Sequence, residues 1–118
     1  MEYNRDLTGD VSYYDQDSVK RTTSGIVRVW TTKIFSENSE TKRKIQNIFI
    51  RLSRDGGEKI HSSKLFWEIY CSKDMWRLMS YTYYDVNGLV LYLPSVPSDW
   101  DYIIPNSDMD KLGKIVCK

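Results

Sequence analysis

Two cysteines, Cys71 and Cys117, constrain this 118-residue chain more than any other residues. Cys71 ends the alternating apolar segment Leu65–Cys71, which predicts a strand, and Cys117 follows the apolar stripe of a predicted C-terminal helix. A disulfide between them would join the strand to the helix, hold the chain end in place and indicate an oxidising compartment. It would close a long loop and stabilise the fold by about 4 kcal/mol. Two free thiols in a cytosolic domain are the alternative.

Strand patterns dominate the rest of the sequence. Residues 26–35 are dense in β-branched and aromatic side chains, which favour strands over helices. Residues 75–84 return after a short turn, and strict alternation there would place Trp76 and Tyr81 on opposite faces. Asn87-Gly88 then predicts a hairpin turn. The remaining predicted strands are 11–14, 18–21 and 89–93.

Two segments predict helices. The first is Glu40–Ser53, which begins after a capping residue, Ser36 or Asn38, and ends before Gly56-Gly57. The second begins at a capping motif that starts with Ser107. The apolar stripes that define them are Ile45, Ile48, Phe49 and Leu52 in the first helix, and Met109, Leu112, Ile115 and Val116 in the second.

Together these elements predict an α+β fold. An antiparallel sheet of about five to six strands would carry one longer helix and a C-terminal helix packed on it, with a disulfide from strand to helix. Residues 11–118 are expected to form a single domain. Residues 1–10 are a polar N-terminal segment that we expect to be disordered at its start.

Charge and hydropathy exclude several classes of partner. Seventeen Lys and Arg against sixteen Asp and Glu give a net charge of +1, which offers no field to attract nucleic acid or an anionic membrane. No run approaches the roughly 18 apolar residues of a transmembrane helix. The polar start Met1–Asp6 cannot be the hydrophobic part of a signal peptide, so an exported protein would be present here in its mature form, without a leader peptide.

Candidate catalytic and metal-binding residues are few. His61 is the only histidine, and its spacing from the nearby serines does not give the geometry of a catalytic triad, so we expect it in a solvated loop. Asp15, Asp17 and Ser18 alternate as in calcium loops, but the glycine and glutamate of an EF-hand are missing, which favours a turn. The basic residues of 42–54 favour a solvated helix face. We therefore predict no catalytic residue, no metal site and no cofactor.

Aromatic residues are the most suggestive candidates for binding. Nine Tyr and four Trp suit half-exposed sheet faces, and the same residue types dominate binding surfaces. Tyr81, Tyr83 and Tyr92 are the predicted contacts, provided that neighbouring strands bring them onto one open face. The alternative is that a helix covers this face and the rings pack in the core. Trp30 has the same two alternatives.

Short segments in a fixed order along the chain carry a family resemblance. They are Tyr13–Asp15 with Ser18-Val19, Gly25–Trp30, Glu68–Cys71, Trp76–Leu78 before Tyr81, Trp100–Pro105 and Lys114–Cys117. This ordered set, with both cysteines, resembles the surface-adhesin protein E family of exported bacterial domains. The resemblance implies an antiparallel sheet with a C-terminal helix fastened by Cys71–Cys117, on an exported or lipid-anchored protein. It also implies adhesion to host matrix proteins such as vitronectin and laminin, and it makes self-association and haem binding possible roles.

The leading prediction is therefore a non-enzymatic exported binding domain. It would bind a protein partner or a cell surface through an aromatic-rich sheet face. One alternative is a periplasmic carrier of a small flat ligand such as haem, with His61 or a tyrosine as the axial ligand. The other is an enzyme-inhibitor domain, with Leu93–Asp99 as the inhibitory loop.

Overall fold

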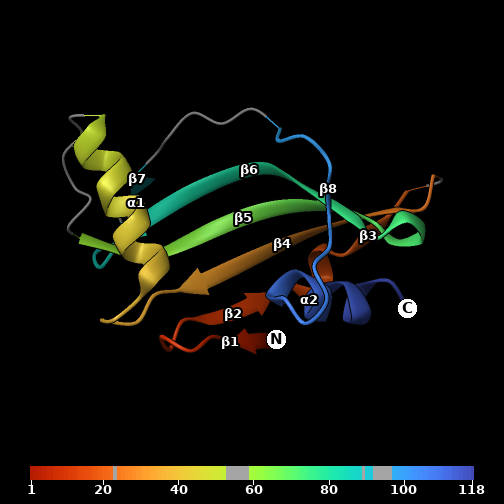
Figure 1. The fold of residues 1–118 in the computed structure, drawn as a ribbon, viewed down its shortest axis with the longest axis horizontal. Helices are drawn as coiled ribbons and strands as arrows, with labels where there is room; N and C mark the ends of the chain where they lie inside the picture. Colours follow the sequence, from red (N-terminus) through yellow and green to blue (C-terminus); the bar gives the residue numbers. More distant parts are fainter. Residues whose placement is uncertain (23, 53–58, 89, 92–96) are drawn as a thin grey trace.

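A computed structural model describes residues 1–22, 24–52, 59–88, 90–91 and 97–118 (Figure 1). Strands and two α-helices account for most of the described residues. In chain order the elements are β1 (Glu2–Arg5), β2 (Val11–Tyr14), the 3₁₀ turn η1 (Gln16–Ser18), β3 (Lys20–Arg21), β4 (Ile26–Ile34), α1 (Glu40–Arg51), β5 (Ile60–Tyr70), the 3₁₀ turn η3 (Cys71–Lys73), β6 (Met75–Asp85), β7 (Val90–Leu91), β8 (Asp101–Tyr102) and α2 (Asp108–Val116).

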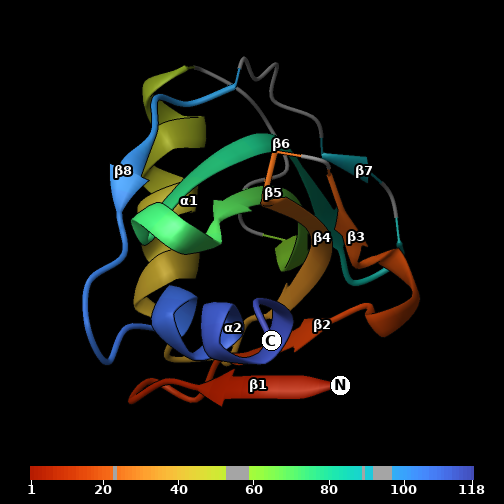
Figure 2. The ribbon, with the colours of Figure 1, turned by 90° about the vertical axis from the view of Figure 1, so that its right-hand side faces the viewer.

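Within the described residues, eight strands form one sheet in the order β1-β2-β4-β5-β6-β7, while β3 pairs with β4 and β8 pairs with β6. Every pairing is antiparallel. The sheet curls, and both helices lie on its concave side, α1 toward one end and α2 beside β1 and β2 (Figures 1 and 2). The predicted α+β class, with two helices packed on an antiparallel sheet, is confirmed.

The N-terminal segment differs from the expectation of disorder at its start. Glu2–Arg5 pairs with β2, and the Met1 amino group donates a hydrogen bond of 2.8 Å to the carbonyl of Tyr14. The buried carboxylate of Asp10 then accepts hydrogen bonds from the Ser36 backbone N–H and the Ser39 hydroxyl. The polar composition of residues 1–10 did not predict this strand, because the strand is held by backbone hydrogen bonds to β2, and these require no apolar pattern in the sequence.

Helix α1 begins at Glu40, as predicted, but its cap lies one residue after Asn38, the later of the two predicted caps. Its N-cap is Ser39, whose Oγ accepts from the Lys42 backbone N–H at 3.0 Å, so Ser36 and Asn38 lie outside the helix. The hydroxyl of Ser39 also donates to Asp10 Oδ2 at 2.6 Å, which selects this residue as the cap. The predicted stop at Gly56-Gly57 lies outside the described residues.

Two apolar clusters form the core on the concave side of the sheet. One lies under α2 and the other under α1. The exposed fractions of Ile48 and Leu52 are 36% and 56%, so half of the predicted stripe of α1 faces outward. The buried members are Tyr14, Val27, Val29, Ile69, Met109, Leu112 and Val116 in the first cluster, and Phe35, Ile45, Phe49 and Ile60 in the second.

The disulfide Cys71–Cys117 is present and joins the turn after β5 to the end of α2. Leu112 and Val116 bury the inner face of α2, whereas Ile115, which the predicted stripe included, is 40% exposed. The Ser107 hydroxyl caps α2 by accepting from the Asp110 backbone N–H, as the capping motif predicts. Packing and a covalent link thus hold the C-terminal helix on the sheet.

A β-bulge in β6 changes which side chains share a face. Trp67 pairs with Leu78 and Phe66 pairs with Ser80, so Met79 is an extra residue on β6. Because side chains alternate along a strand, the bulge brings Trp76 and Tyr81 onto the same, helix-covered face. The prediction from strict alternation, which separated these two rings, is wrong for this reason.

Candidate binding face

The convex side of the sheet carries a set of aromatic and charged side chains, which we call the open face. Neither α-helix packs on it, because both apolar clusters lie on the concave side. Directly paired residues of β4, β5 and β6 point to the same side, so this set can be read from the strand register. Its members are Arg28, Trp30, Lys64, Phe66, Glu68, Tyr70 and Arg77, with Trp100 from the segment before β8.

A row of three charged residues crosses the middle of the open face. Arg28, Glu68 and Arg77 are directly paired on β4, β5 and β6. Arg28 Nε donates to Glu68 Oε2 at 2.7 Å, and Arg77 Nη2 lies 2.7 Å from Glu68 Oε1. The Glu68 side chain is 1% exposed, whereas those of Arg28 and Arg77 are 50% and 31% exposed. The carboxylate therefore holds two guanidinium groups in fixed positions at the surface.

The two arginines keep Glu68 ionised despite its burial. Burial by itself would raise the pKa of Glu68. The hydrogen bonds and positive charges of Arg28 and Arg77 outweigh that effect and lower the pKa below its usual value. Each arginine retains further N–H groups, since a guanidinium carries five donors.

On one side of this row, Trp30 and Phe66 form a stacked pair. Their ring centroids lie 4.6 Å apart with an interplanar angle of 26°, and the two residues are directly paired on β4 and β5. The Lys64 ammonium lies 5.3 Å from the centroid of the Trp30 ring, within the range of a cation–π contact. Trp30 thus belongs to the open face and not to the core.

On the other side of the row, a second aromatic pair continues the pattern. Tyr70 and Trp100 contact edge to face at 5.9 Å, and Arg77 lies 4.7 Å from the centroid of Trp100. Lys73 lies 5.1 Å from the centroid of Tyr70. The first aromatic pair of the open face therefore has a cation over one ring, and the second pair has a cation over each ring.

A surface cavity of about 420 Å³ lies beside the first aromatic pair. Trp30 and Phe66 contribute its aromatic wall, and Arg28 lies next to them. The turn η1 and the start of β3 supply the opposite rim through Asp15, Asp17, Ser18 and Lys20. This is the place on the open face where aromatic, acidic and basic groups meet around one hollow.

The predicted contacts lie elsewhere. Tyr81 and Tyr83 are half-buried on the helix-covered face, where Tyr83 meets Phe49 of α1 edge to face at 6.2 Å. Burial, and to a lesser degree Tyr81, raises the pKa of Tyr83 to about 12. Tyr92 lies outside the described residues. Their role in binding stays a prediction.

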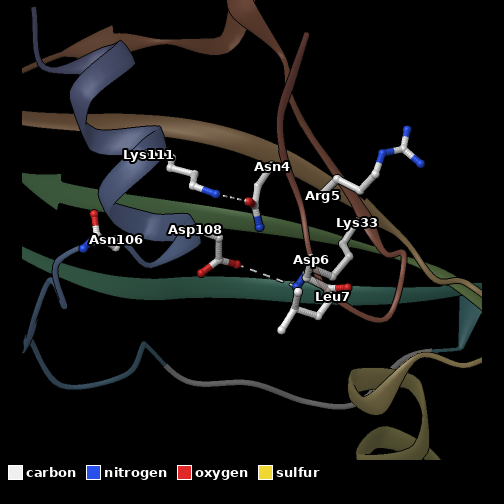
Figure 3. A pocket seen from close by; sticks show the side chains of 8 residues that line it. All are labelled: Asn4, Arg5, Asp6, Leu7, Lys33, Asn106, Asp108 and Lys111. Atoms are coloured by element: carbon white, nitrogen blue, oxygen red, sulfur yellow. Dashed lines mark hydrogen bonds and ion pairs between the residues drawn. The ribbon is translucent and has the colours of Figure 1, made fainter.

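A second cavity of about 420 Å³ is lined mainly by charged and amide groups (Figure 3). It lies between the β1–β2 loop, the end of β4 and the start of α2. Figure 3 shows Lys111 directed at Asn4, with an Nζ–Oδ1 distance of 2.7 Å, and Lys33 directed at Asp108, at 3.7 Å. Most of its polar groups are thus engaged with one another.

The other candidates from the sequence lie in separate elements of the described chain. His61 is exposed as expected, but it lies within β5, at an irregularity near its start, and not in a loop. Asp15 caps η1 by accepting from the Asp17 backbone N–H. No group of three or more potential ligands for a metal ion occurs among the described residues.

Of the predicted inhibitory loop Leu93–Asp99, residues 93–96 lie outside the described residues. No described helix is long and apolar enough to cross a membrane.

The open face could be found only in part from the sequence. Alternation in β5 separates Phe66 and Tyr70 from Trp67 and Ile69, and that separation holds. Which of the two sides the helices cover was not readable from the pattern, because both sides are aromatic. The contact of Trp100 with Tyr70 had no local signal, since the two residues are far apart in the sequence.

Comparison with known proteins identifies the family. The family model for surface-adhesin protein E matches residues 2–118. Crystal structures of Haemophilus influenzae protein E share the fold: crystal form II aligns with a TM-score of 0.62 at 13% identity, covering 90% of this chain and 79% of that one. A selenomethionine form aligns with a TM-score of 0.63 at 13% identity, covering 90% and 78%. No curated protein sequence matches the chain. With the Cys71–Cys117 disulfide and the match over nearly its whole length, the chain belongs to the surface-adhesin protein E family.

Proposed function

We propose that this protein is a non-enzymatic, exported bacterial adhesin domain that attaches to a partner at a cell surface through its open face. The observation that carries the proposal is two aromatic pairs, with a cation over three of their four rings, on the side of the sheet that neither helix covers. Trp, Tyr and Arg are the residues that most often dominate binding energy at interfaces. The family assignment supports adhesion as the use of that surface.

Contacts within the open face hold its side chains in place in the absence of a partner. Glu68 holds Arg28 and Arg77, and the rings of Trp30 and Phe66 hold each other. A partner would therefore meet side chains that have already lost much of their rotamer freedom, which lowers the entropic cost of association. The mixture of rings and cations favours partners that offer flat apolar groups together with hydrogen-bond acceptors.

A binding assay with surface variants tests the proposal. Purified protein is passed over immobilised vitronectin and laminin, the partners that the family resemblance implies, and over cultured epithelial cells. We expect Trp30→Ala and Trp100→Ala each to weaken binding about tenfold or more, as truncation of a central aromatic contact does. Ile50→Ala, which shortens a 73% exposed side chain on α1, is the control and should bind as the unaltered protein does.

Two results would contradict the proposed surface. Folded Trp30→Ala and Trp100→Ala variants that bind as the unaltered protein does would remove the open face from the mechanism. A selective loss of binding in a folded Tyr83→Ala variant would instead move the contact surface to the helix-covered side, where the predicted contacts Tyr81 and Tyr83 lie.

A further inference from the structure

We propose that the cavity beside Trp30 binds a neutral saccharide unit of a surface glycan. The inference rests on the proposed function and names the chemistry of the partner. The cavity of about 420 Å³ falls within the range of roughly 300–1,000 Å³ that small-ligand sites occupy. Its lining combines an aromatic wall with a rim of both hydrogen-bond donors and acceptors.

The aromatic wall suits the apolar side of a sugar ring. A pyranose presents several C–H groups on one side, and an aromatic ring offers a flat, polarisable surface of similar size. Trp30 and Phe66 both line the cavity, whereas Lys64, which lies over the Trp30 ring, does not. Lys64 is therefore not part of the cavity wall that the two rings form.

The rim suits the hydroxyl groups, each of which both donates and accepts a hydrogen bond. Asp15 and Asp17 supply acceptors, and Lys20 and Arg28 supply donors. Arg28 uses its Nε to hold Glu68, and its terminal amino groups have no hydrogen-bond partner among the described residues. The side chain of Asp17 likewise forms no hydrogen bond or ion pair within the described chain.

The rim is also held against the aromatic wall. The backbone N–H of Asp15 donates to the Trp30 carbonyl at 2.9 Å. Ser18 Oγ accepts from the Trp30 backbone N–H at 3.0 Å and donates to the Asp15 carbonyl at 2.7 Å. Turn η1 is thus fixed to β4 on both sides, so the donors, acceptors and rings keep their relative positions.

The charge of the lining favours a neutral ligand over a charged one. The two carboxylates of Asp15 and Asp17 balance the two cations Lys20 and Arg28, so a polyanion would be repelled by the carboxylates and a polycation by the cations. The second cavity, shown in Figure 3, offers no aromatic wall, and its lysines already contact Asn4 and Asp108. These contrasts assign the saccharide to the cavity beside Trp30.

Titration with defined oligosaccharides tests the inference. The probes are chitotetraose, N-acetyllactosamine and mannotriose, with a hyaluronan tetrasaccharide as the anionic comparison, and binding is followed by saturation-transfer NMR and tryptophan fluorescence. We expect saturable binding of at least one neutral probe, weakened about tenfold or more by Trp30→Ala. The matched control is Tyr102→Ala, which removes a 70% exposed ring outside the cavity and should leave the affinity unchanged.

The Asp17→Ala variant distinguishes a neutral ligand from an anionic one, because it removes a hydrogen-bond acceptor and a negative charge without breaking a described side-chain contact. The affinity for the neutral probes should fall severalfold. Tighter binding of hyaluronan, with no binding of a neutral probe, would overturn the inference. So would the absence of binding by all three neutral probes, or equal binding by the Trp30→Ala and Tyr102→Ala variants.

Enzymatically deglycosylated vitronectin and laminin distinguish this inference from the proposed function. If Trp30→Ala weakens attachment to native and deglycosylated proteins equally, the open face binds protein, and the inference that the cavity binds a saccharide is wrong. If Trp30→Ala changes neither attachment nor oligosaccharide binding, both proposals fail together.

Discussion

Replacing Cys117 by serine removes the covalent link between the turn after β5 and the end of α2. The disulfide spans a sequence separation of 46, and a cross-link of that length removes loop-closure entropy from the unfolded chain worth about 4 kcal/mol. The folded state should survive the loss, because Leu112 and Val116 remain buried against the sheet. The expected effect is therefore a fall in the free energy of unfolding of about 4 kcal/mol with the fold retained, a large share of the ~5–15 kcal/mol that typically stabilises a domain.

Urea unfolding followed by circular dichroism measures this change. With a denaturant slope near ~2 kcal/mol/M, the Cys117→Ser midpoint should fall by roughly 2 M. The melting temperature should fall by about 10–20 °C. A Cys71→Ser, Cys117→Ser double variant is the control, since reductant should destabilise the unaltered protein and leave the double variant unchanged. Unaltered protein that unfolds at the same midpoint with and without reductant would refute the reasoning.

Three further variants test the remaining parts of the structure. Glu68→Gln should lower the free energy of unfolding by about 1–3 kcal/mol, a reduced figure because Arg28 and Arg77 are partly solvated. Folding lowers the pKa of Glu68 from 4.5, so its stabilisation is present above pH 4.5 and is lost as the pH falls through the lower, folded value. The difference in free energy of unfolding between the unaltered protein and Glu68→Gln should therefore shrink in acid. A difference that persists unchanged in acid would contradict this. Since folding raises the pKa of Tyr83 from 10.0 to about 12, its neutral form stabilises the fold below pH 10 and this contribution is lost as the pH rises toward 12. Burial also raises the pKa of Tyr3 to about 12, so ultraviolet titration should show a late tyrosinate step that is smaller, not absent, in Tyr83→Phe. A late step of unchanged size in that variant would contradict the assignment to Tyr83. Ser39→Ala, which removes the cap of α1, should cost about 1–2 kcal/mol by thermal unfolding, and an unchanged melting temperature would exclude the capping role.

Local pattern was sufficient to predict the main elements. The strand at 26–35 appears as β4, the helix from Glu40 as α1 and the capping motif at Ser107 as the start of α2. Each has a signal within a few residues: β-branched density, an apolar stripe, or a capping hydroxyl. The short strand Glu2–Arg5 had none, because a strand at the edge of a sheet is specified by the partner it pairs with.

The binding face was harder to predict because it depends on which side of the sheet is covered. Alternation separates Phe66 from Trp67 in β5, but both sides carry aromatic rings and either could have packed against the helices. In β6 the bulge at Met79 then placed Tyr81 on the covered side. A bulge has no reliable sequence signal, since it is set by the fit between two strands.

The sequence by itself determined the α+β class, the alternation of β5 and the pair of cysteines available to fasten the C-terminus, because all three depend on local periodicity or on residue chemistry. The tertiary structure decided which face stays open, which rings meet, and how Arg28, Glu68 and Arg77 come into one row. Those outcomes depend on strand register and on packing between residues that are distant in the chain. A one-residue bulge is enough to exchange the core face and the binding face.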